Sequence, residues 1–367
     1  MVVRKLGYGT NSSVWLAKET TPDGHCYVVI KVLSVAATCA ECDDLCYEAA
    51  VAESMCQFRT SDTTHPGFRH CATIREAFIE ESAHGEHFCV VLPPYGTSLR
   101  DILETSPTCR FPLRTVKRVT RQVLLGLSFL ESKLQRVHTD VKLANILVDL
   151  GATTEQIDSF LANDPPQIYA DSPPINPLMS PHPIPVVRSQ PLPNFGLDPS
   201  YENLHIRLID YGNAIRADDI SPDTFICTPT DQRAPEMLLG HAWSYPVEVW
   251  AVGCLIFQML TRRAPFPPYT GDDHLAVIYD RLGPFPMDFV RRCRHGEELV
   301  DSQGIPRSNE HGAIVQGSLE RRVATACQDL GTQDLSDLCR FLRKCFTIDP
   351  LMRPTVPELL ADAWLVL

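Results

Sequence analysis

The hydrophobic pattern divides the chain into two parts of different kind. Over 1–93, short apolar runs rich in β-branched residues alternate with turn signals, as CYVVIKVL (26–33) does after TPDG, which is typical of β-strands. Over 94–367, apolar residues recur at helical spacing, most clearly in 114–133 and 246–261. We therefore predict an α+β fold in which a small β-rich lobe with one helix is followed by a larger, mainly helical lobe.

A proline-rich segment interrupts the second part. Residues 165–199 contain 11 prolines, a density that excludes helices and central strands. The segment also holds Ile, Leu, Val, Tyr and Phe, so we expect part of it to be ordered. We interpret about 151–203 as an insert in the larger lobe of one domain that spans 1–367.

The composition restricts the classes of partner. The formal net charge is −12, which argues against direct contact with nucleic acid or an anionic membrane and leaves room for a basic partner. The chain has 14 cysteines without a regular pairing pattern, no signal peptide, and no apolar run as long as a membrane span. We expect a monomeric intracellular protein of the cytoplasm, the nucleus or both.

A glycine hairpin lies near the start of the chain. In GYGTNSSV (7–14), Gly7 and Gly9 allow a tight turn whose backbone N–H groups can approach anionic oxygens. Ser12 stands where a third glycine of G-x-G-x-x-G would be. Lys31 ends a β-branched run 17 residues after Val14, which is the spacing of a phosphate-pairing lysine.

Such a lysine requires a carboxylate partner. A helix predicted over 41–58 offers Glu48 and Glu53, which lie near one helical face. We prefer Glu53 because it stands further into the helix, and we keep Glu48 as the alternative.

A polar loop, HTDVKLAN (138–145), is followed directly by the apolar run NILV. In a phosphoryl-transfer loop of this pattern, Asp140 would orient a hydroxyl and accept its proton, Lys142 would neutralise developing charge, and Asn145 would bind a metal ion. Asp210 ends another apolar run in IRLIDYGNA and is predicted to be a second Mg²⁺ ligand.

The segment RAPEMLLG (233–240) precedes the apolar helix at 246–261. An A-P-E element before such a helix is typical of protein kinases and distinguishes them from small-molecule kinases that share the Asp/Asn loop. Arg353 in DPLMRPT is placed to form an ion pair with Glu236.

Taken in this order, the motifs resemble eukaryotic protein kinases over essentially the whole chain. LGYGTNSSVWLAKE, HTDVKLANILV with Thr139 after the histidine, and DYGNA after a spacer are similar to the SR-protein kinase family, especially its fungal branch. The resemblance implies a bilobal kinase fold, ATP and Mg²⁺, and transfer to Ser or Thr of protein substrates, which in well-studied members are Arg/Ser-rich splicing proteins.

The resemblance also assigns roles to residues. It implies catalytic roles for Asp140, Lys142, Lys31 and Glu53, and Mg²⁺ binding by Asn145 and Asp210. ATP is expected to contact Gly7, Gly9, Ser12, Val14, Val29, Lys31, Pro93, Tyr95 and Leu147.

Several positions depart from the family's pattern. Thr139 replaces the arginine that gathers a phosphorylated activation loop, so we predict that no such phosphate is needed. Glu248 replaces an anchoring Asp, and Pro229 a Thr for which Thr228 or Thr230 could substitute. The first strand looks clipped, because the chain begins almost on the glycine hairpin. The alternative hypothesis is therefore a pseudokinase scaffold that binds nucleotide or partners without catalysis.

Overall fold

The structure is a computed structural model that describes residues 1–42, 46–61, 64–106, 110–149, 151–169, 186–221, 224, 227–267, 274–309 and 317–366. Its contacts group into two compact units. The sheet unit comprises Met1–Thr64, Cys71–Thr97 and Leu147–Gly212, and the helical unit comprises His65–His70, Ser98–Ile146 and Asn213–Leu367. The contacts group the predicted insert with the sheet unit, whereas the sequence analysis placed it in the larger lobe.

A five-stranded antiparallel sheet forms the centre of the sheet unit, in the order β1-β2-β3-β5-β4. Its strands are β1 (Val2–Tyr8), β2 (Ser12–Thr21), β3 (Gly24–Leu33), β4 (Glu76–Ser82) and β5 (Gly85–Leu92). Val28 and Val91 are buried together with Ala17 in one apolar cluster. The apolar runs of the sequence therefore become adjacent strands, as predicted.

Two helices replace the single helix predicted over 41–58. α1 (Val35–Cys42) follows β3, and α2 (Glu48–Ser61) follows a short connection in which 43–45 lie outside the described residues. The prediction of one helix was wrong. The apolar residues keep helical spacing between α1 and α2, but contacts with other parts of the fold separate the two helices.

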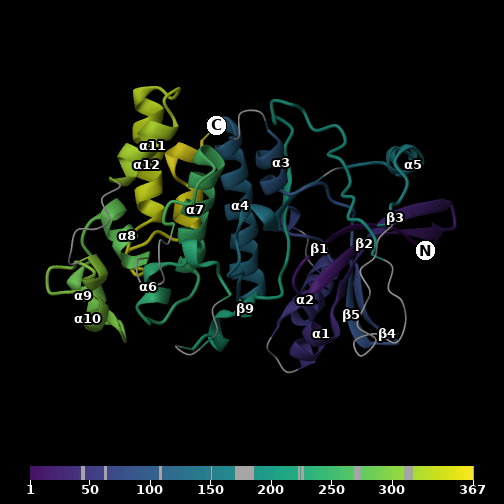
Figure 1. Cartoon of the computed structure of the whole chain (residues 1–367), viewed down its shortest axis with the longest axis horizontal. Coiled ribbons are helices and arrows are strands. Elements are labelled where there is room, and N and C mark those ends of the chain that lie inside the picture. The colour runs from purple at the N-terminus through teal and green to yellow at the C-terminus, as the bar shows by residue number, and fades with distance from the viewer. Residues whose placement is uncertain are drawn as a thin grey trace. The chain divides into compact units, whose positions relative to one another are not determined.

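The insert is tied to the sheet by charged side chains. α5 (Thr154–Asn163) begins with a capping box at Thr153 and lies beside β3 (Figure 1). The Tyr27 hydroxyl donates to Asp158 Oδ1 over 2.6 Å, and the buried guanidinium of Arg4 is 3.1 Å from Asp164 Oδ2. Ile168 bridges to Val187, so the expected partial order is confirmed on both sides of 170–185, which lie outside the described residues.

The helical unit is built around two long helices predicted from the sequence. α4 (Leu113–Leu134) buries the apolar face that includes Val116, Val123 and Leu130, and it packs against the almost wholly buried α7 (Pro246–Thr261). The other helices are α3 (Leu99–Thr105), α6 (Pro235–Leu238), α8 (His274–Leu282), α9 (Met287–Val290), α10 (Gly296–Leu299), α11 (Leu319–Ala326), α12 (Thr332–Cys345) and α13 (Val356–Leu360).

Short strand pairs flank the loops of interest. β6 (Arg136–Val137) pairs with β9 (Ile215–Arg216), and β7 (Ile146–Val148) pairs with β8 (Ile206–Leu208). Because β6 immediately precedes HTDVKLAN and β8 precedes Asp210, each functional loop is anchored by a strand.

Close packing holds α7 in place. A Cβ at Gly253 would lie only 2.7 Å from the ring of Phe346, so only glycine allows this approach. Trp250 stacks on Phe266 with ring centroids 4.9 Å apart, and Phe346 contacts both rings edge-on. This aromatic cluster fixes the position of α7, the helix that contains Glu248.

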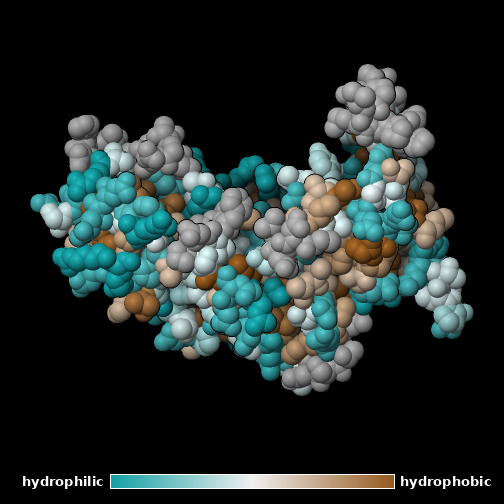
Figure 2. Space-filling model, turned by 90° about the horizontal axis from the view of Figure 1, so that it is seen from below, coloured by the Kyte–Doolittle hydropathy of each residue, from teal (hydrophilic) through white to brown (hydrophobic). Residues whose placement is uncertain are grey.

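Hydrophilic residues cover much of the face drawn in Figure 2, with hydrophobic residues scattered among them, which is usual for a globular protein. Among the helices of the described residues, none is both long and apolar enough to cross a membrane.

Candidate active site

The glycine hairpin joins β1 to β2. The Gly9 N–H donates to the Ser12 carbonyl over 2.9 Å, and Gly7 stands opposite Val14 in the strand register. A Cβ added at Gly7 or Gly9 would meet no other atom within 4 Å. The open space along this backbone fits the close approach of phosphate groups.

Lys31 is the centre of a charged cluster on the sheet. It stands opposite Val14 on one side and Val90 on the other. Its Nζ lies 2.5 Å from Glu48 Oε2 and 2.8 Å from Asp210 Oδ1. Burial disfavours the charged amine, yet the two carboxylates outweigh it and raise the pKa of Lys31. The amine is therefore held as a cation near the glycine hairpin.

The carboxylate partner of Lys31 is Glu48, so the preference for Glu53 was wrong. Glu48 is buried at the first position of α2, whereas Glu53 is exposed and accepts a hydrogen bond from Gln57 over 3.2 Å. Burial raises the pKa of Glu48, Lys31 lowers it, and the net direction is upward.

Glu41 positions Glu48, and sequence reasoning missed it. Its carboxylate accepts the backbone N–H groups of Glu48 and Ala49 over 2.9 and 3.0 Å. It thereby satisfies two of the N–H groups that the first turn of α2 leaves open. Glu41 lies within α1, seven residues before Glu48, so no local sequence signal pointed to this contact.

The DYG segment is fixed by its tyrosine and glycine. The buried Tyr211 hydroxyl donates to the Leu208 carbonyl and accepts the Ala72 N–H, over 2.8 and 2.9 Å. The Gly212 carbonyl accepts the Tyr47 N–H, one residue before Glu48. Asp210 itself has a φ of +69°, a strained value for a side chain of this type. Contacts on both sides therefore hold Asp210 toward Lys31.

The apolar residues predicted to contact adenine also lie on the sheet unit. Val29 is buried and stands opposite Leu92, directly before Pro93. The Tyr95 hydroxyl accepts the Thr73 N–H over 3.0 Å. The Gly96 N–H donates to the Val148 carbonyl, which brings the segment after Tyr95 beside β7, the strand that contains Leu147. All nine residues predicted to contact ATP thus belong to this unit, together with Glu48 and Asp210.

Asp140 lies in a compact network of the helical unit. The Lys142 Nζ is 2.7 Å from Asp140 Oδ2, and the Asn145 amide donates to the same oxygen and to the Asp140 carbonyl over 2.9 Å. Asp140 Oδ1 is buried and has no hydrogen-bond partner within the part of the chain that the structure describes. The structure therefore brings Asp140, Lys142 and Asn145 together, as the spacing predicted.

Thr139 connects this loop to three other segments. Its N–H donates to the buried Glu248 carboxylate over 2.8 Å, and its hydroxyl donates to the Asn213 carbonyl over 2.9 Å. Its own carbonyl accepts the Thr228 hydroxyl over 2.6 Å. Glu248 thus anchors the loop from α7, and the Thr228 hydroxyl, beside Pro229, contacts the loop at Thr139.

The Glu236–Arg353 ion pair is confirmed. The two groups are fully buried and make a two-pronged contact of 2.7 and 2.9 Å. Such a fork joins α6 to the segment before α13 with fixed geometry.

Comparison with known proteins agrees with this geometry. The family profile "Protein kinase domain" matches residues 194–365, and "Protein tyrosine and serine/threonine kinase" matches residues 1–167. A crystal structure of a kinase domain superposes with a TM-score of 0.68 and 22% identity, covering 100% of this chain and 94% of that one. This likeness establishes the protein kinase fold.

Curated relatives are similar along most of the chain. Serine/threonine-protein kinase SRPK of Physarum polycephalum is 26% identical, covering 83% of this chain and 71% of that protein. A serine/threonine protein kinase of Aspergillus fumigatus is 27% identical, covering 100% and 84%. The dual specificity protein kinase lkh1 of Schizosaccharomyces pombe is 27% identical over 98% of this chain, which spans only 46% of that protein. With one kinase profile on each part of the sequence and the kinase fold over its length, the chain belongs to the protein kinase family.

Proposed function

We propose that this kinase transfers the terminal phosphoryl group of ATP to Ser or Thr hydroxyls of proteins. One observation carries the proposal: Lys142 and Asn145 hold one carboxylate oxygen of Asp140, while the other is buried without a partner in the described part of the chain. That second oxygen is available to accept a hydrogen bond from a substrate hydroxyl.

In this proposal Asp140 orients the hydroxyl and takes up its proton as the oxygen attacks phosphorus. The phosphorus–oxygen bond to the leaving ADP breaks as the new one forms. Lys142, beside the carboxylate, offsets the negative charge on the transferred group. The network fixes the position of Asp140, and orientation accounts for much of the rate enhancement in phosphoryl transfer.

The sheet unit supplies the groups proposed to bind ATP. The open backbone at Gly7 and Gly9 suits phosphate oxygens, and the cationic Lys31 suits the α- and β-phosphates. Val14, Val29 and Leu147 offer apolar contacts to adenine, and the Pro93 carbonyl and Tyr95 N–H offer hydrogen bonds.

The proposed Mg²⁺ ligands have suitable chemistry. Asp210 offers a carboxylate. The amide nitrogen of Asn145 donates to Asp140, so the amide oxygen of Asn145 is the atom that can bind the ion. Mg²⁺ prefers hard oxygen ligands of this kind. When bound, the ion neutralises phosphate charge.

Thr139 bears on regulation. Its hydroxyl and backbone are engaged with Asn213, Thr228 and Glu248, and it carries no charge that could bind a phosphate. We therefore propose that activity does not require a phosphorylated activation loop.

Arg/Ser-rich proteins are the substrate class that we propose. The net charge of −12 is complementary to basic polypeptides, and a similar protein from Physarum polycephalum is named SRPK. A relative of dual specificity makes tyrosine the competing acceptor.

The test is transfer of labelled phosphate from ATP with Mg²⁺ to an Arg-Ser repeat peptide, a Ser-free version, a tyrosine version and a generic basic protein. Formation of phosphoserine in the Arg-Ser repeat peptide, and in none of the other three substrates, supports the proposal. Transfer only to the generic protein discards the substrate class, and phosphotyrosine extends the acceptor. No transfer by a folded protein that ATP stabilises against heat would instead identify a pseudokinase.

A further inference from the structure

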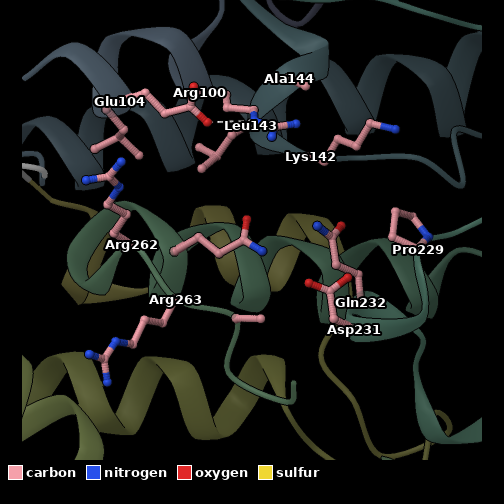
Figure 3. Close-up of a pocket in the computed structure, with 13 residues that line it drawn as sticks. Arg100, Glu104, Lys142, Leu143, Ala144, Pro229, Asp231, Gln232, Arg262 and Arg263 are labelled. Atoms are coloured by element: carbon pink, nitrogen blue, oxygen red, sulfur yellow. Dashed lines mark hydrogen bonds and ion pairs between the residues drawn. The ribbon is translucent and has the colours of Figure 1, made fainter. Parts of the chain in front are cut away.

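A pocket of about 510 Å³ in the helical unit belongs to the site already described. Its walls include Lys142, Asp231 and Gln232 (Figure 3). Lys142 also contacts Asp140, so an occupant of this pocket would lie next to the residue proposed to take up the acceptor proton. A surface without a role in that site lies on the sheet unit, at the outer edge of β4.

β4 (Glu76–Ser82) is the last strand of the sheet and lies beside β5 (Figure 1). It pairs with β5 residue by residue, from Glu76 opposite Val91 to Ser82 opposite Gly85. In an antiparallel strand, every second residue turns its N–H and C=O groups away from the paired neighbour. No strand of the described residues pairs with this outer side. β4 therefore offers a regular row of hydrogen-bonding groups to another chain.

The opposite edge of the sheet is covered by the chain itself. On β1, the Lys5 carbonyl accepts the Gln190 N–H over 2.9 Å, and the buried guanidinium of Arg4 contacts Asp164. The insert thus occupies part of the outer side of β1. On β4, by contrast, all seven residues are exposed, although α2 lies against the strand.

Two large apolar side chains stand on the open strand. Phe78 is 38% exposed and Ile79 is 51% exposed. Because side chains alternate along a strand, the two residues lie on opposite faces of β4. An added strand would cover both, since its side chains would lie beside those of β4 on each face. β4 also lacks the proline, lysine and bulge with which natural edge strands resist such pairing.

The charge of this edge selects the kind of partner. The β4–β5 hairpin carries exposed glutamates at four positions: Glu76, Glu80, Glu81 and Glu86. Residues 76–91 contain no lysine or arginine. Like charges opposite each other destabilise a strand pair, whereas opposite charges stabilise it. A second copy of β4 would bring glutamates against glutamates, so the edge disfavours its own kind and favours a cationic strand.

We propose that the outer edge of β4 binds an extended basic segment of a partner protein, which joins the sheet as an additional strand. Main-chain hydrogen bonds supply affinity in such a complex, and the side chains supply specificity. The matching segment has Lys or Arg opposite Glu76, Glu80 and Glu81, and apolar residues opposite Phe78 and Ile79. The proposal does not depend on phosphoryl transfer, because β4 contains none of the residues assigned to that reaction.

The experiment measures binding of the labelled synthetic peptide Val-Lys-Lys-Val-Val-Val-Lys by fluorescence anisotropy, without ATP. Paired antiparallel to β4, this peptide places its lysines opposite Glu81, Glu80 and Glu76. It has no hydroxyl side chain, so it is not a substrate. A version N-methylated at every residue keeps the side chains but loses the N–H donors, and it should bind at least about 10-fold more weakly. A version with Glu in place of Lys should also bind at least about 10-fold more weakly.

Matched variants test the charges of the edge. Glu80→Gln/Glu81→Gln should weaken binding of the lysine peptide about 3- to 10-fold, because each exposed ion pair contributes modestly. Asp23→Asn/Glu155→Gln removes two exposed acids from other segments of the same unit and should leave binding unchanged. Glu80→Lys/Glu81→Lys should prefer the Glu version of the peptide. Thermal unfolding of each variant verifies that the fold is retained, as expected for exposed positions.

Hydrogen exchange of the β4 amides tests the mode of binding. Slower exchange in β4 when the lysine peptide is added to the wild type supports strand addition. Equal affinity for the N-methylated peptide, or affinity for the lysine peptide that survives both changes at Glu80 and Glu81, would overturn it. A wild-type dimer in sedimentation velocity, with β4 amides protected in the absence of peptide, would assign the edge to a second copy and overturn the basic partner.

Discussion

The Lys31 amine lies 2.5 Å from the carboxylate of Glu48, the first residue of α2, while Glu53 in the same helix is exposed. The Lys–Glu pair of this kinase therefore depends on where α2 begins. Glu41 caps that first turn, and the Gly212 carbonyl accepts the preceding N–H. The start of α2, the Lys31–Glu48 ion pair and the DYG segment are thus connected by direct contacts.

Glu48→Gln should lower kcat/KM for ATP about 10-fold or more, because the variant loses a buried, charge-assisted contact with Lys31. Glu53→Gln, the same change on the exposed face of α2, should stay close to the wild type. Steady-state kinetics with varied ATP tests the pair. A large loss for Glu53→Gln with little for Glu48→Gln would reverse the assignment.

Arg353→Met should reduce the free energy of unfolding by about 3–5 kcal/mol, because it leaves the fully buried Glu236 charge unpaired. Adding Glu236→Gln should restore part of the loss. Arg291→Ala breaks the exposed pair with Asp288 and should cost less than about 1 kcal/mol. Urea unfolding of the wild type, Arg353→Met, Arg353→Met/Glu236→Gln and Arg291→Ala measures these differences. Similar losses of stability for the buried and the exposed pair would refute the argument.

Asp164→Asn should destabilise the sheet unit, because it removes the carboxylate that pairs with the buried guanidinium of Arg4. Arg4 also lies over the Phe160 ring, 4.9 Å from its centroid. Since Asp164 is partly exposed, we expect a loss of about 1–3 kcal/mol. KM for ATP should also rise, because β1 leads into the glycine hairpin. Asp23→Asn, an exposed change on the same unit, is the control; identical unfolding curves for the two variants would mean that the insert does not support the sheet.

His274 should make stability depend on pH. Burial, together with nearby Arg233, lowers the pKa of His274 from 6.5 to about 4, and neither ring nitrogen has a hydrogen-bond partner among the described residues. Between these values the unfolded chain takes up a proton that the folded chain does not, so stability falls as pH drops from about 6.5 to about 4. The contribution reaches about 3 kcal/mol.

The measurement is urea unfolding across this range for the wild type, His274→Leu and the exposed control His84→Leu. Only His274→Leu should flatten the pH dependence. Parallel curves for the wild type and His274→Leu would show that the histidine is protonated alike in both states.

Local spacing predicted the helical unit better than the sheet unit. Asp140, Lys142 and Asn145 lie within one short loop, so their meeting required no knowledge of distant packing. Glu236 and Arg353 are far apart, yet each belongs to a motif that fixes its place. Glu53 was preferred to Glu48 because the break before α2, which depends on Glu41 and Gly212, cannot be read from the local spacing. The attachment of the insert was missed because Arg4–Asp164 and Tyr27–Asp158 join segments that no local pattern connects.

The most direct measurement of the central claim is the rate of phosphate transfer to a Ser peptide by Asp140→Asn, with ATP affinity measured on the same protein. Asp140 accepts its contacts from Lys142 and Asn145 within the helical unit, and the residues proposed to bind ATP belong to the sheet unit. The account predicts a loss of about 100-fold or more in kcat with ATP affinity close to the wild type. The exposed change Asp218→Asn should leave both unchanged. Transfer by Asp140→Asn within a few-fold of the wild-type rate would contradict the role of Asp140 and the proposed mechanism.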